Sequence, residues 1–411
     1  MSEPQPNDST IVVIGASLAG LRAAEEVRHE GHAGDVIIVG DEVHAPYDRP
    51  PLSKQLLAGK WDVARIHHHA PDKLDTLGLE FRLGRRATAL DTDSRVVSFD
   101  DGSELGYDGL IVATGARARV LPGTEGMVGV HTLRTLDDCL GLKSDLEAAG
   151  DGARVVVIGA GFIGAEVAAT CHGLGASVTV VEALPTPLGR VLGEQMGEAC
   201  AGLHRDAGVA LRVGVGVDRV DAGAGESAPT TVHLTDGTAL EAEVVVVGIG
   251  VVPEVDWLEG SGLTLEDGVV CSDKLFAADR VVAAGDVARW THRRMGEDLR
   301  VEHWTNAAEG GAAAARNLLA GSGAGERYEP VPFFWSDQYA TKIQVVGRPG
   351  PDDEVVVVDG SVAERKLVAL YRRGDKLSAA LAFSRPRQLM AYRPLLAAGA
   401  SFDEALAVAR S

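Results

Sequence analysis

The sequence lacks any closely spaced pair of cysteines. Its four cysteines are Cys139, Cys171, Cys200 and Cys271, and the two nearest in sequence are 29 positions apart. No CxxC or CxxxxC dithiol can form, which excludes disulfide exchange through such a motif. We expect four buried or partly buried free thiols in a reducing compartment.

Long apolar runs and a basic leader are also missing. No segment approaches the ~18 uninterrupted apolar residues that a transmembrane helix needs. The first ten residues, MSEPQPNDST, are polar and have no signal-peptide core. The formal net charge is −20, with 39 Lys and Arg against 59 Asp and Glu, which argues against nucleic acid and anionic membranes as partners. These features predict a cytoplasmic protein.

Glycine, by contrast, is abundant, with 50 among 411 residues, and 45% of the chain is hydrophobic. Glycines in such number are typical of tight turns and of close contacts between backbone and ligand. The apolar fraction is enough for two or three domains with cores of their own.

A first nucleotide motif lies near the N-terminus. The apolar run 11–14 predicts a buried strand, a glycine turn follows, and residues 21–27 predict a helix. This order places a diphosphate over the helix N-terminus. The turn departs from GxGxxG because Ser17 replaces the middle glycine, so a purely structural turn is the alternative. The residues expected to hold the nucleotide are Gly15, Ser17, Leu18, Ala19 and Gly20.

An acid follows the next predicted strand, 35–40. Asp41 comes 26 residues after Gly15, near the spacing expected for a carboxylate that binds a ribose. The alternatives are an ordinary surface acid, or Glu42 in the same role.

The second motif is complete. Residues 154–158 predict a strand, and Gly159, Gly161 and Gly164 satisfy GxGxxG before a helix at 165–173. The following strand, 177–181, ends on Glu182, 23 residues after Gly159. These features together predict a second dinucleotide site, to which Phe162 and Ile163 also belong.

Glu182 also indicates which nucleotide binds. A carboxylate accepts hydrogen bonds from ribose hydroxyls and repels a 2′-phosphate, and Ala183 follows it where an arginine would favour that phosphate. NADH is therefore preferred over NADPH, although Arg190 is close enough in sequence to weaken the preference.

Two such motifs in one chain suggest FAD first and NAD second, with a hydride passing from nicotinamide to flavin.

Buried strands that end in small residues, at 107–117 and 243–253, indicate where the chain leaves and re-enters the first domain. The strand 280–286 ends on Gly285 and Asp286, an acid placed to bind a ligand hydroxyl or to cap a helix. We predict a discontinuous FAD domain at 1–116 and 249–326, an NAD domain at 117–248, and a small α+β domain at 327–411.

Several blocks are more specific than the glycine patterns. They are 46–54, 133–137, 161–166, 302–307 and 334–338. With them, from about residue 10 to 400, the chain resembles the FAD-dependent ferredoxin reductases that serve cytochrome P450s and Rieske oxygenases. The resemblance implies an α/β fold of the glutathione-reductase type, with two Rossmann-like domains and a small C-terminal domain. It also implies FAD and NADH as cofactors and a [2Fe–2S] ferredoxin as electron acceptor.

The resemblance implies roles for individual residues. Lys54 and Glu166 would pair beside the flavin, and Trp304 would lie against the flavin and nicotinamide; core packing is the alternative for Trp304. Arg49 and Arg134 would neutralise the diphosphate or flavin edge, and Asp286 would bind the ribitol. Further cofactor contacts are expected at Ala87, Thr114, Gly115, Gly250, Gly285, Glu302, His303 and Trp335.

Charge points to an acidic ferredoxin. Residues 331–411 hold 11 Lys and Arg against 9 Asp and Glu, so the other 330 residues hold 28 against 50. We expect ten basic residues to steer the partner, with ordinary solvated charge as the alternative. They are Arg289, Arg293, Arg294, Arg300, Arg365, Lys366, Arg372, Arg373, Arg385 and Arg387. The protein itself is expected to be a monomer or a weak dimer.

Other functions remain open. Rubredoxin or another small carrier could replace the ferredoxin, and an NADH-responsive signalling flavoprotein is a non-catalytic alternative. Disulfide reductases and NADH oxidases need a redox cysteine near residues 46–54 or in the first helices, and none is there. No metal is expected, because the three consecutive histidines at 67–69 cannot all face one site in a regular element.

Overall fold

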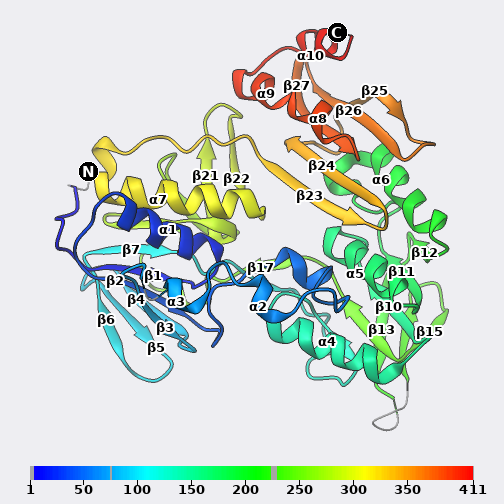
Figure 1. The fold of residues 1–411 in the computed structure, drawn as a ribbon, viewed down its shortest axis with the longest axis horizontal. Helices are drawn as coiled ribbons and strands as arrows, with labels where there is room; N and C mark the ends of the chain where they lie inside the picture. Colours follow the sequence, from blue (N-terminus) through cyan, green and yellow to red (C-terminus); the bar gives the residue numbers. More distant parts are fainter. Residues whose placement is uncertain (1–3, 75, 224–228, 411) are drawn as a thin grey trace. The chain divides into compact units, whose positions relative to one another are not determined.

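The computed structural model describes residues 4–74, 76–223 and 229–410, and the chain divides into two compact units, each built from three segments (Figure 1). Unit 1 comprises residues 1–48, 66–117 and 252–332, and unit 2 comprises residues 49–65, 118–251 and 333–411. Residues 49–65, which lie inside the predicted FAD domain, therefore group with unit 2. The predicted domain bounds remain a prediction.

Unit 1 is organised around a six-stranded sheet in the order β19-β20-β7-β1-β2-β3. Its strands are β1 (Ile11–Ile14), β2 (Val36–Gly40), β3 (Glu80–Leu83), β7 (Gly109–Val112), β19 (Phe276–Ala278) and β20 (Val281–Ala283). The first strand is parallel to both of its neighbours, β2 and β7, and all three are fully buried. Continuous apolar sequence is what a parallel strand covered on both faces requires.

Helices α1 (Leu18–His29) and α7 (Trp304–Ala324) run against each other in unit 1 (Figure 1). They approach so closely that a Cβ on Gly311 would lie 2.2 Å from the carbonyl oxygen of Ala19. Only glycine allows this approach, and it places the first half of α7 directly against the start of α1.

Three glycines among residues 321–325 predict, from the sequence, a flexible junction before the C-terminal domain. The structure instead extends helix α7 through most of this run: the helix kinks at Gly321, where φ is 76°, and continues to Ala324. The Lys274 ammonium donates to the Ser322 carbonyl at 3.0 Å, which satisfies one of the carbonyls near the helix end.

Smaller elements complete unit 1 and its boundaries. Two three-stranded sheets are formed by β4 (Ala87–Asp91), β5 (Val96–Phe99) and β6 (Glu104–Gly106), and by β18 (Val269–Cys271), β21 (Ala288–His292) and β22 (Glu297–Arg300). Short helical turns are α3 (Pro71–Leu74), η2 (Asp256–Leu258) and η3 (Gly285–Val287), and the boundary strands are β8 (Ala116–Ala118) and β17 (Val251–Pro253).

Unit 2 contains a second Rossmann-like sheet in the order β12-β11-β10-β16-β9. Its strands are β9 (Val130–His131), β10 (Arg154–Ile158), β11 (Ser177–Glu182), β12 (Ala210–Val213) and β16 (Val244–Val247). The associated elements are η1 (Pro50–Ser53), α2 (Val63–Ile66), α4 (Leu136–Ala149), α5 (Phe162–Gly173), α6 (Gly189–Asp206), β13 (Val217–Asp221), β14 (Thr230–Leu234) and β15 (Ala239–Ala242). The sequence also predicts a mobile hairpin tip at 221–231, and residues 224–228 of this segment lie outside the described residues.

The C-terminal part of unit 2 is a five-stranded antiparallel sheet in the order β23-β24-β27-β26-β25. Its elements are β23 (Phe333–Gln338), β24 (Thr341–Gly347), β25 (Glu354–Ser361), β26 (Lys366–Arg373), β27 (Lys376–Phe383), α8 (Pro386–Met390), α9 (Arg393–Ala398) and α10 (Phe402–Ala409). One face packs on α6 through a buried cluster that includes Met196, Ile343 and Tyr371.

Helix α6 kinks at Gly193, where φ is 74°. The Tyr371 hydroxyl donates to the Leu192 carbonyl beside the kink at 2.9 Å. The antiparallel sheet therefore stabilises the broken helix by a hydrogen bond as well as by apolar burial. Within the described part of the chain, no helix combines the length and the apolar character that spanning a bilayer requires.

Candidate functional site

The first glycine turn of unit 1 has the backbone that a bound diphosphate needs. Gly15 has φ of 117°, and a Cβ there would lie 2.1 Å from the Ala113 carbonyl oxygen. A Cβ on Gly20 would lie 1.9 Å from the Gly15 carbonyl oxygen. No side chain caps helix α1 at Ser17, so the N–H groups of the first helical turn remain available to an anion. The turn fits the expected FAD diphosphate, and Leu18 and Ala19 belong to the same first turn of α1.

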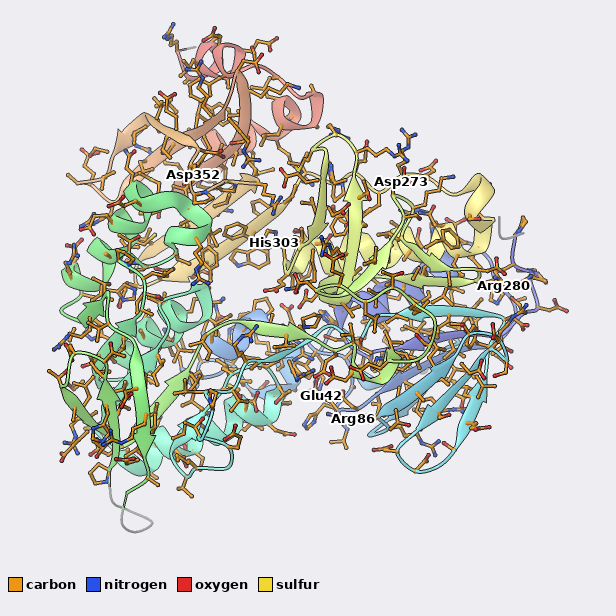
Figure 2. All side chains as sticks on the ribbon, turned by 180° about the vertical axis from the view of Figure 1, so that it is seen from behind. Glu42, Arg86, Asp273, Arg280, His303 and Asp352 are labelled. Carbon is orange, nitrogen blue, oxygen red and sulfur yellow. The ribbon has the colours of Figure 1, made fainter. Side chains whose placement is uncertain are left out.

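Asp286 lies close to this turn. Gly285 has φ of 75°, and a Cβ on it would be 2.9 Å from the Cβ of Ala19. Asp286 also acts electrostatically on His303, which is labelled in Figure 2. Burial lowers the pKa of His303 to about 4, and the Asp286 carboxylate opposes this shift. The strand end and the start of α7 therefore both face the first turn of α1, and the neutral imidazole can serve as a hydrogen-bonding group there.

Trp304 is held from its polar end. Its indole Nε1 donates to the Asp48 carboxylate at 2.6 Å, and the side chain is only half-buried. Partial exposure together with a fixed ring favours a ligand-facing role over core packing. Glu302, two residues earlier, is paired with Arg300 at 2.6 Å.

The region of the predicted ribose carboxylate lies beyond β2. Asp41 is paired with Arg86 at 3.4 Å, and both side chains are exposed. Glu42 instead accepts a hydrogen bond from Tyr47 at 2.5 Å (Glu42 and Arg86 are labelled in Figure 2). Asp41 is thus the freer carboxylate for a ribose. Arg86, which precedes Ala87 at the start of β4, was not singled out from the sequence.

Two predicted contacts of unit 1 lie at the end of β7. The Thr114 hydroxyl donates to the Glu254 carbonyl at 2.8 Å, which ties together the two crossing segments of the chain. Gly115 has φ of 69°, so the turn depends on a glycine there.

The second glycine turn, in unit 2, has the same construction. Gly159 has φ of 100°, and a Cβ there would lie 2.3 Å from the Gly248 carbonyl oxygen. A Cβ on Gly164 would lie 2.0 Å from the Gly159 carbonyl oxygen, whereas Gly161 faces open space, its nearest contact being 4.0 Å away. Helix α5 has no side-chain cap at Gly161, so its N-terminal N–H groups are also available to a diphosphate.

Glu182 stands beside this turn. One carboxylate oxygen accepts from the Ala160 N–H at 2.8 Å and the other from the Leu184 N–H at 2.9 Å. The carboxylate is therefore fixed at the end of β11, where a nucleotide ribose is expected. Other predicted contacts in unit 2 are Ile163 and Arg190, which are exposed; Phe162 and Trp335, which are half-buried; and Gly250, which has φ of 97°.

Glu166 accepts hydrogen bonds from several neighbouring groups. Lys54 Nζ lies 2.8 Å from Oε2, so the expected ion pair is present, with side chains 12% and 4% exposed. The same oxygen accepts from Ser53 at 2.6 Å, and Oε1 accepts from Ser336 at 2.8 Å. Neither serine was singled out from the sequence.

The segment that carries Lys54 is fixed by contacts to α4 and α5. Thr170, one turn after Glu166 on α5, donates to the Ser53 carbonyl at 2.7 Å, and Cys139 donates to the Leu52 carbonyl at 3.2 Å. Arg49 donates to the Arg134 carbonyl at 2.5 Å. The spacing of Glu166 and Thr170, four residues apart on one helix face, is the sequence signal that could have identified Thr170.

The four cysteines are free and buried, as the sequence predicted. Burial raises the pKa of Cys139 to about 11 and those of Cys171, Cys200 and Cys271 to about 12. Thiols of this kind are poor nucleophiles, which supports the exclusion of dithiol chemistry.

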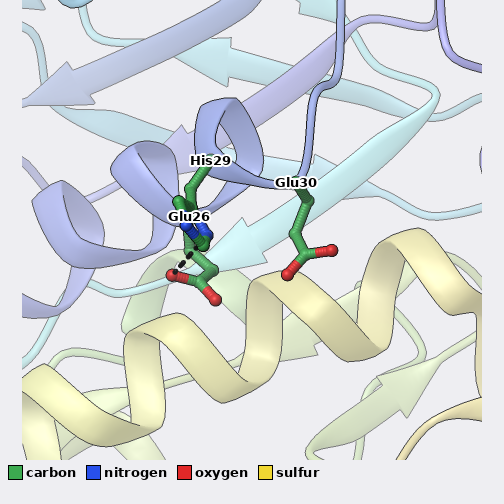
Figure 3. Close-up of side chains that lie close together, drawn as sticks. All are labelled: Glu26, His29 and Glu30. Atoms are coloured by element: carbon green, nitrogen blue, oxygen red, sulfur yellow. Dashed lines mark ion pairs between the residues drawn. The ribbon is translucent and has the colours of Figure 1, made fainter.

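The described residues contain one group with metal-ligand character, on the surface of α1 (Figure 3). It consists of Glu26, His29 and Glu30, and Glu26 is also ion-paired with Arg316. Two of the three side chains are exposed, and we assign no metal to them. Within the 67–69 run, His69 contacts Glu25, and burial lowers the pKa of His68.

Comparison with known proteins identifies the family. Residues 9–311 match the model described as pyridine nucleotide-disulphide oxidoreductase, and residues 333–411 match a reductase C-terminal domain. The chain belongs to the pyridine nucleotide-disulphide oxidoreductases. It is 35% identical to rhodocoxin reductase of Rhodococcus erythropolis, over 98% of this chain and 95% of that one. Identity is 36% to the ferredoxin–NAD(+) reductase component of an anthranilate 1,2-dioxygenase system from Burkholderia cepacia, over 95% of each chain.

A solved structure supports the same assignment. The covalent putidaredoxin reductase–putidaredoxin complex matches with a TM-score of 0.90 and 32% identity, over 95% of this chain and 93% of the matched chain. The predicted family, α/β fold class and oxidoreductase activity are thereby confirmed. FAD and NADH are the cofactors that the family uses, and the two uncapped glycine turns fit them.

Proposed function

We propose that this chain transfers electrons from NADH through FAD to a [2Fe–2S] ferredoxin, which in turn serves a cytochrome P450 or a Rieske oxygenase. The observation that carries the proposal is similarity, over nearly the whole chain, to rhodocoxin reductase and to a dioxygenase reductase component, together with one open diphosphate turn in each unit. FAD, when bound, accepts a hydride from NADH and releases single electrons.

Residues of unit 1 would hold FAD. The N–H groups at the start of α1 bind its diphosphate, Asp41 binds a ribose hydroxyl and Asp286 a ribitol hydroxyl. Trp304, oriented by Asp48, provides a flat aromatic surface. The neutral His303 beside Asp286 adds a hydrogen-bonding group without adding charge.

Residues of unit 2 would hold NADH. The start of α5 binds the diphosphate, and the fixed Glu182 carboxylate accepts from the adenosine ribose and repels a 2′-phosphate. Lys54 supplies a positive charge, and Glu166 holds it in one position. These contacts would position the two cofactors, which is the contribution that hydride transfer requires of a protein.

We also propose that the ferredoxin is acidic. The positive field of this chain that would steer it is smaller than the basic residues in the sequence suggest. In unit 1, Arg289, Arg293 and Arg294 pair with Glu266, Asp273 and Glu329 at 3.1, 2.5 and 3.4 Å. In unit 2, the basic residues Arg365, Arg372, Arg373 and Arg385 pair with Asp206, Glu354, Asp353 and Asp359. Such pairs reduce the net positive field, so steering depends on the donors that the arginines still present to solvent.

Cytoplasmic location and a monomeric or weakly dimeric state complete the proposal. Sedimentation of the holoprotein at micromolar concentration would distinguish the monomer from the dimer.

Two alternatives remain to be tested. A small carrier such as rubredoxin is the second candidate partner, and an NADH-responsive signalling flavoprotein is the non-catalytic candidate function.

NADH-dependent cytochrome c reduction by the FAD-loaded protein tests the function, with and without [2Fe–2S] ferredoxins from the same organism. A large ferredoxin-dependent rate is expected. Rapid ferricyanide reduction with no acceleration by any ferredoxin would reject the proposed partner and leave the nucleotide sites intact. Rubredoxin added in the same assay measures the second candidate directly, and slow turnover with every acceptor would favour the signalling role.

A further inference from the structure

The hydrogen-bond donors around Glu166 form a complete shell. The carboxylate is 4% exposed, and an ionised group so deeply buried is destabilising unless it is paired and hydrogen-bonded. Lys54 and Ser53 donate to Oε2, at 2.8 and 2.6 Å. Ser336 and the Asp337 N–H donate to Oε1, at 2.8 and 3.2 Å. Each oxygen therefore has two donors.

One donor in this shell is oriented by another residue. The Ser336 side chain has no exposed surface, and its Oγ accepts from Nε2 of Gln338 at 3.3 Å. A hydroxyl has a single proton, and an amide N–H can only donate. The Ser336 hydroxyl proton is therefore donated to Glu166: Gln338 donates to Ser336, and Ser336 donates to Glu166.

The position of Glu166 gives this orientation a consequence. Glu166 lies on α5, the helix whose uncapped N-terminus forms the second diphosphate turn at Gly161. Oε2 of its carboxylate contacts Lys54, which lies on the 49–54 segment. The Glu166 carboxylate thus links α5 to Lys54. The donors on β23 of the C-terminal sheet, which bind Oε1, fix the orientation of this carboxylate.

We propose that Ser336 is a positioning residue for the NADH reaction. By donating its hydroxyl proton to Oε1, it holds the Glu166 carboxylate where Oε2 meets Lys54. The inference rests on the proposed function and deepens it, because it gives the C-terminal sheet a role in the reductive step in addition to packing. Ser53, whose side chain is 2% exposed, acts in the same way on the other oxygen.

A matched control exists in the same sheet. Ser378 on β27 also donates to a carboxylate, that of Asp353, at 2.7 Å. Ser336→Ala and Ser378→Ala therefore each remove one serine–carboxylate hydrogen bond from the C-terminal sheet. Only the former affects Glu166.

The experiment compares the two FAD-loaded variants with the wild type, in the absence of any ferredoxin. Ser336→Ala should slow flavin bleaching by NADH roughly tenfold, the effect expected when one hydrogen bond to a charged group is lost. It should also alter the flavin absorption spectrum and raise the flavin midpoint potential, because a loosened carboxylate neutralises less well the charge of Lys54, which the family resemblance places beside the flavin. Ser378→Ala should leave rate, spectrum and potential at the wild-type values, even where both variants lose similar thermal stability.

Equal rates and potentials in the two alanine variants would overturn the inference and reduce Ser336 to a packing residue. If Ser336→Ala does not fold, Ser53→Ala carries the same test: a shifted potential supports the inference, and wild-type values reject it. The proposed function fails in a different way, through a wild-type protein that NADH does not bleach or that no ferredoxin oxidises.

Discussion

The indole nitrogen of Trp304 donates a 2.6 Å hydrogen bond to the carboxylate of Asp48, a residue 256 positions away in the chain. Trp304 is the first residue of α7, and Asp48 precedes the 49–65 segment. The bond fixes the plane of a half-buried ring whose predicted neighbours are the flavin and the nicotinamide.

Removing this acceptor should affect turnover more than folding. Asp48→Ala is expected to lower kcat for NADH-dependent ferricyanide reduction about tenfold, because the indole loses its charged partner and the ring can rotate. Asp48→Asn keeps an acceptor oxygen and should retain most of the rate. Stopped-flow bleaching and steady-state assays measure both variants; equal loss in the two would show that charge, rather than ring orientation, matters.

Glu182 should determine coenzyme preference. Two backbone N–H groups hold its carboxylate, so the negative charge has a fixed position. Glu182→Gln is expected to raise the ratio of kcat/KM for NADPH to that for NADH at least about tenfold, since one charged interaction with the ribose is lost and one repulsion is relieved. Glu198→Gln, an exposed acid on α6 paired with Arg205, is the control and should leave the ratio unchanged.

Acid should destabilise the protein through His204. Burial lowers its pKa to about 4, and Nε2 has no hydrogen-bond partner among the described residues. Between about pH 6.5 and pH 4 the unfolded state binds the proton and the folded state does not, so stability falls as the pH falls through this window. The loss from this one group is about 2 kcal/mol at pH 5 relative to pH 8.

His204→Gln should therefore reduce the difference in melting temperature between pH 8 and pH 5. His29→Gln is the matched control, because the His29 side chain is 79% exposed. A pH dependence unchanged in His204→Gln would contradict the assignment.

Charge reversal tests the acidic partner. Arg293→Glu with Arg294→Glu should raise the KM for the ferredoxin and leave ferricyanide turnover unchanged, with a larger effect at low salt. The same change at Arg212 and Arg219, which are ion-paired on the nucleotide part of unit 2, keeps the net charge equal and should leave KM unaltered. Equal KM increases in both double variants would indicate a general charge effect.

Local features of the fold could be predicted from the sequence, and distant contacts could not. Each glycine turn was predicted because strand, turn and helix are consecutive in the chain, and Gly15 and Gly159 indeed occupy left-handed conformations. The Lys54–Glu166 ion pair came from family resemblance. The contact of Ser336 with Glu166 could not be predicted, because the two residues are 170 positions apart in the chain. The local sequence around Ser336 does not indicate which face of its strand packs on α5. A flexible junction was predicted at 321–325 because glycine-rich sequence is typical of flexible segments. In the structure, a kink at Gly321 and the contact of Lys274 with the Ser322 carbonyl allow the helix to continue.

The division of both units into three segments each has a consequence for synthesis on the ribosome. Unit 1 has its last segment at 252–332, so its sheet cannot be completed until most of the chain has emerged. Unit 2 needs residues 333–411 as well. Both units depend on pairings between distant segments, which are slow to form and expose strand edges in the meantime. A chain halted after residue 332 would contain every segment of the first unit while lacking the serine that orients Glu166 in the second.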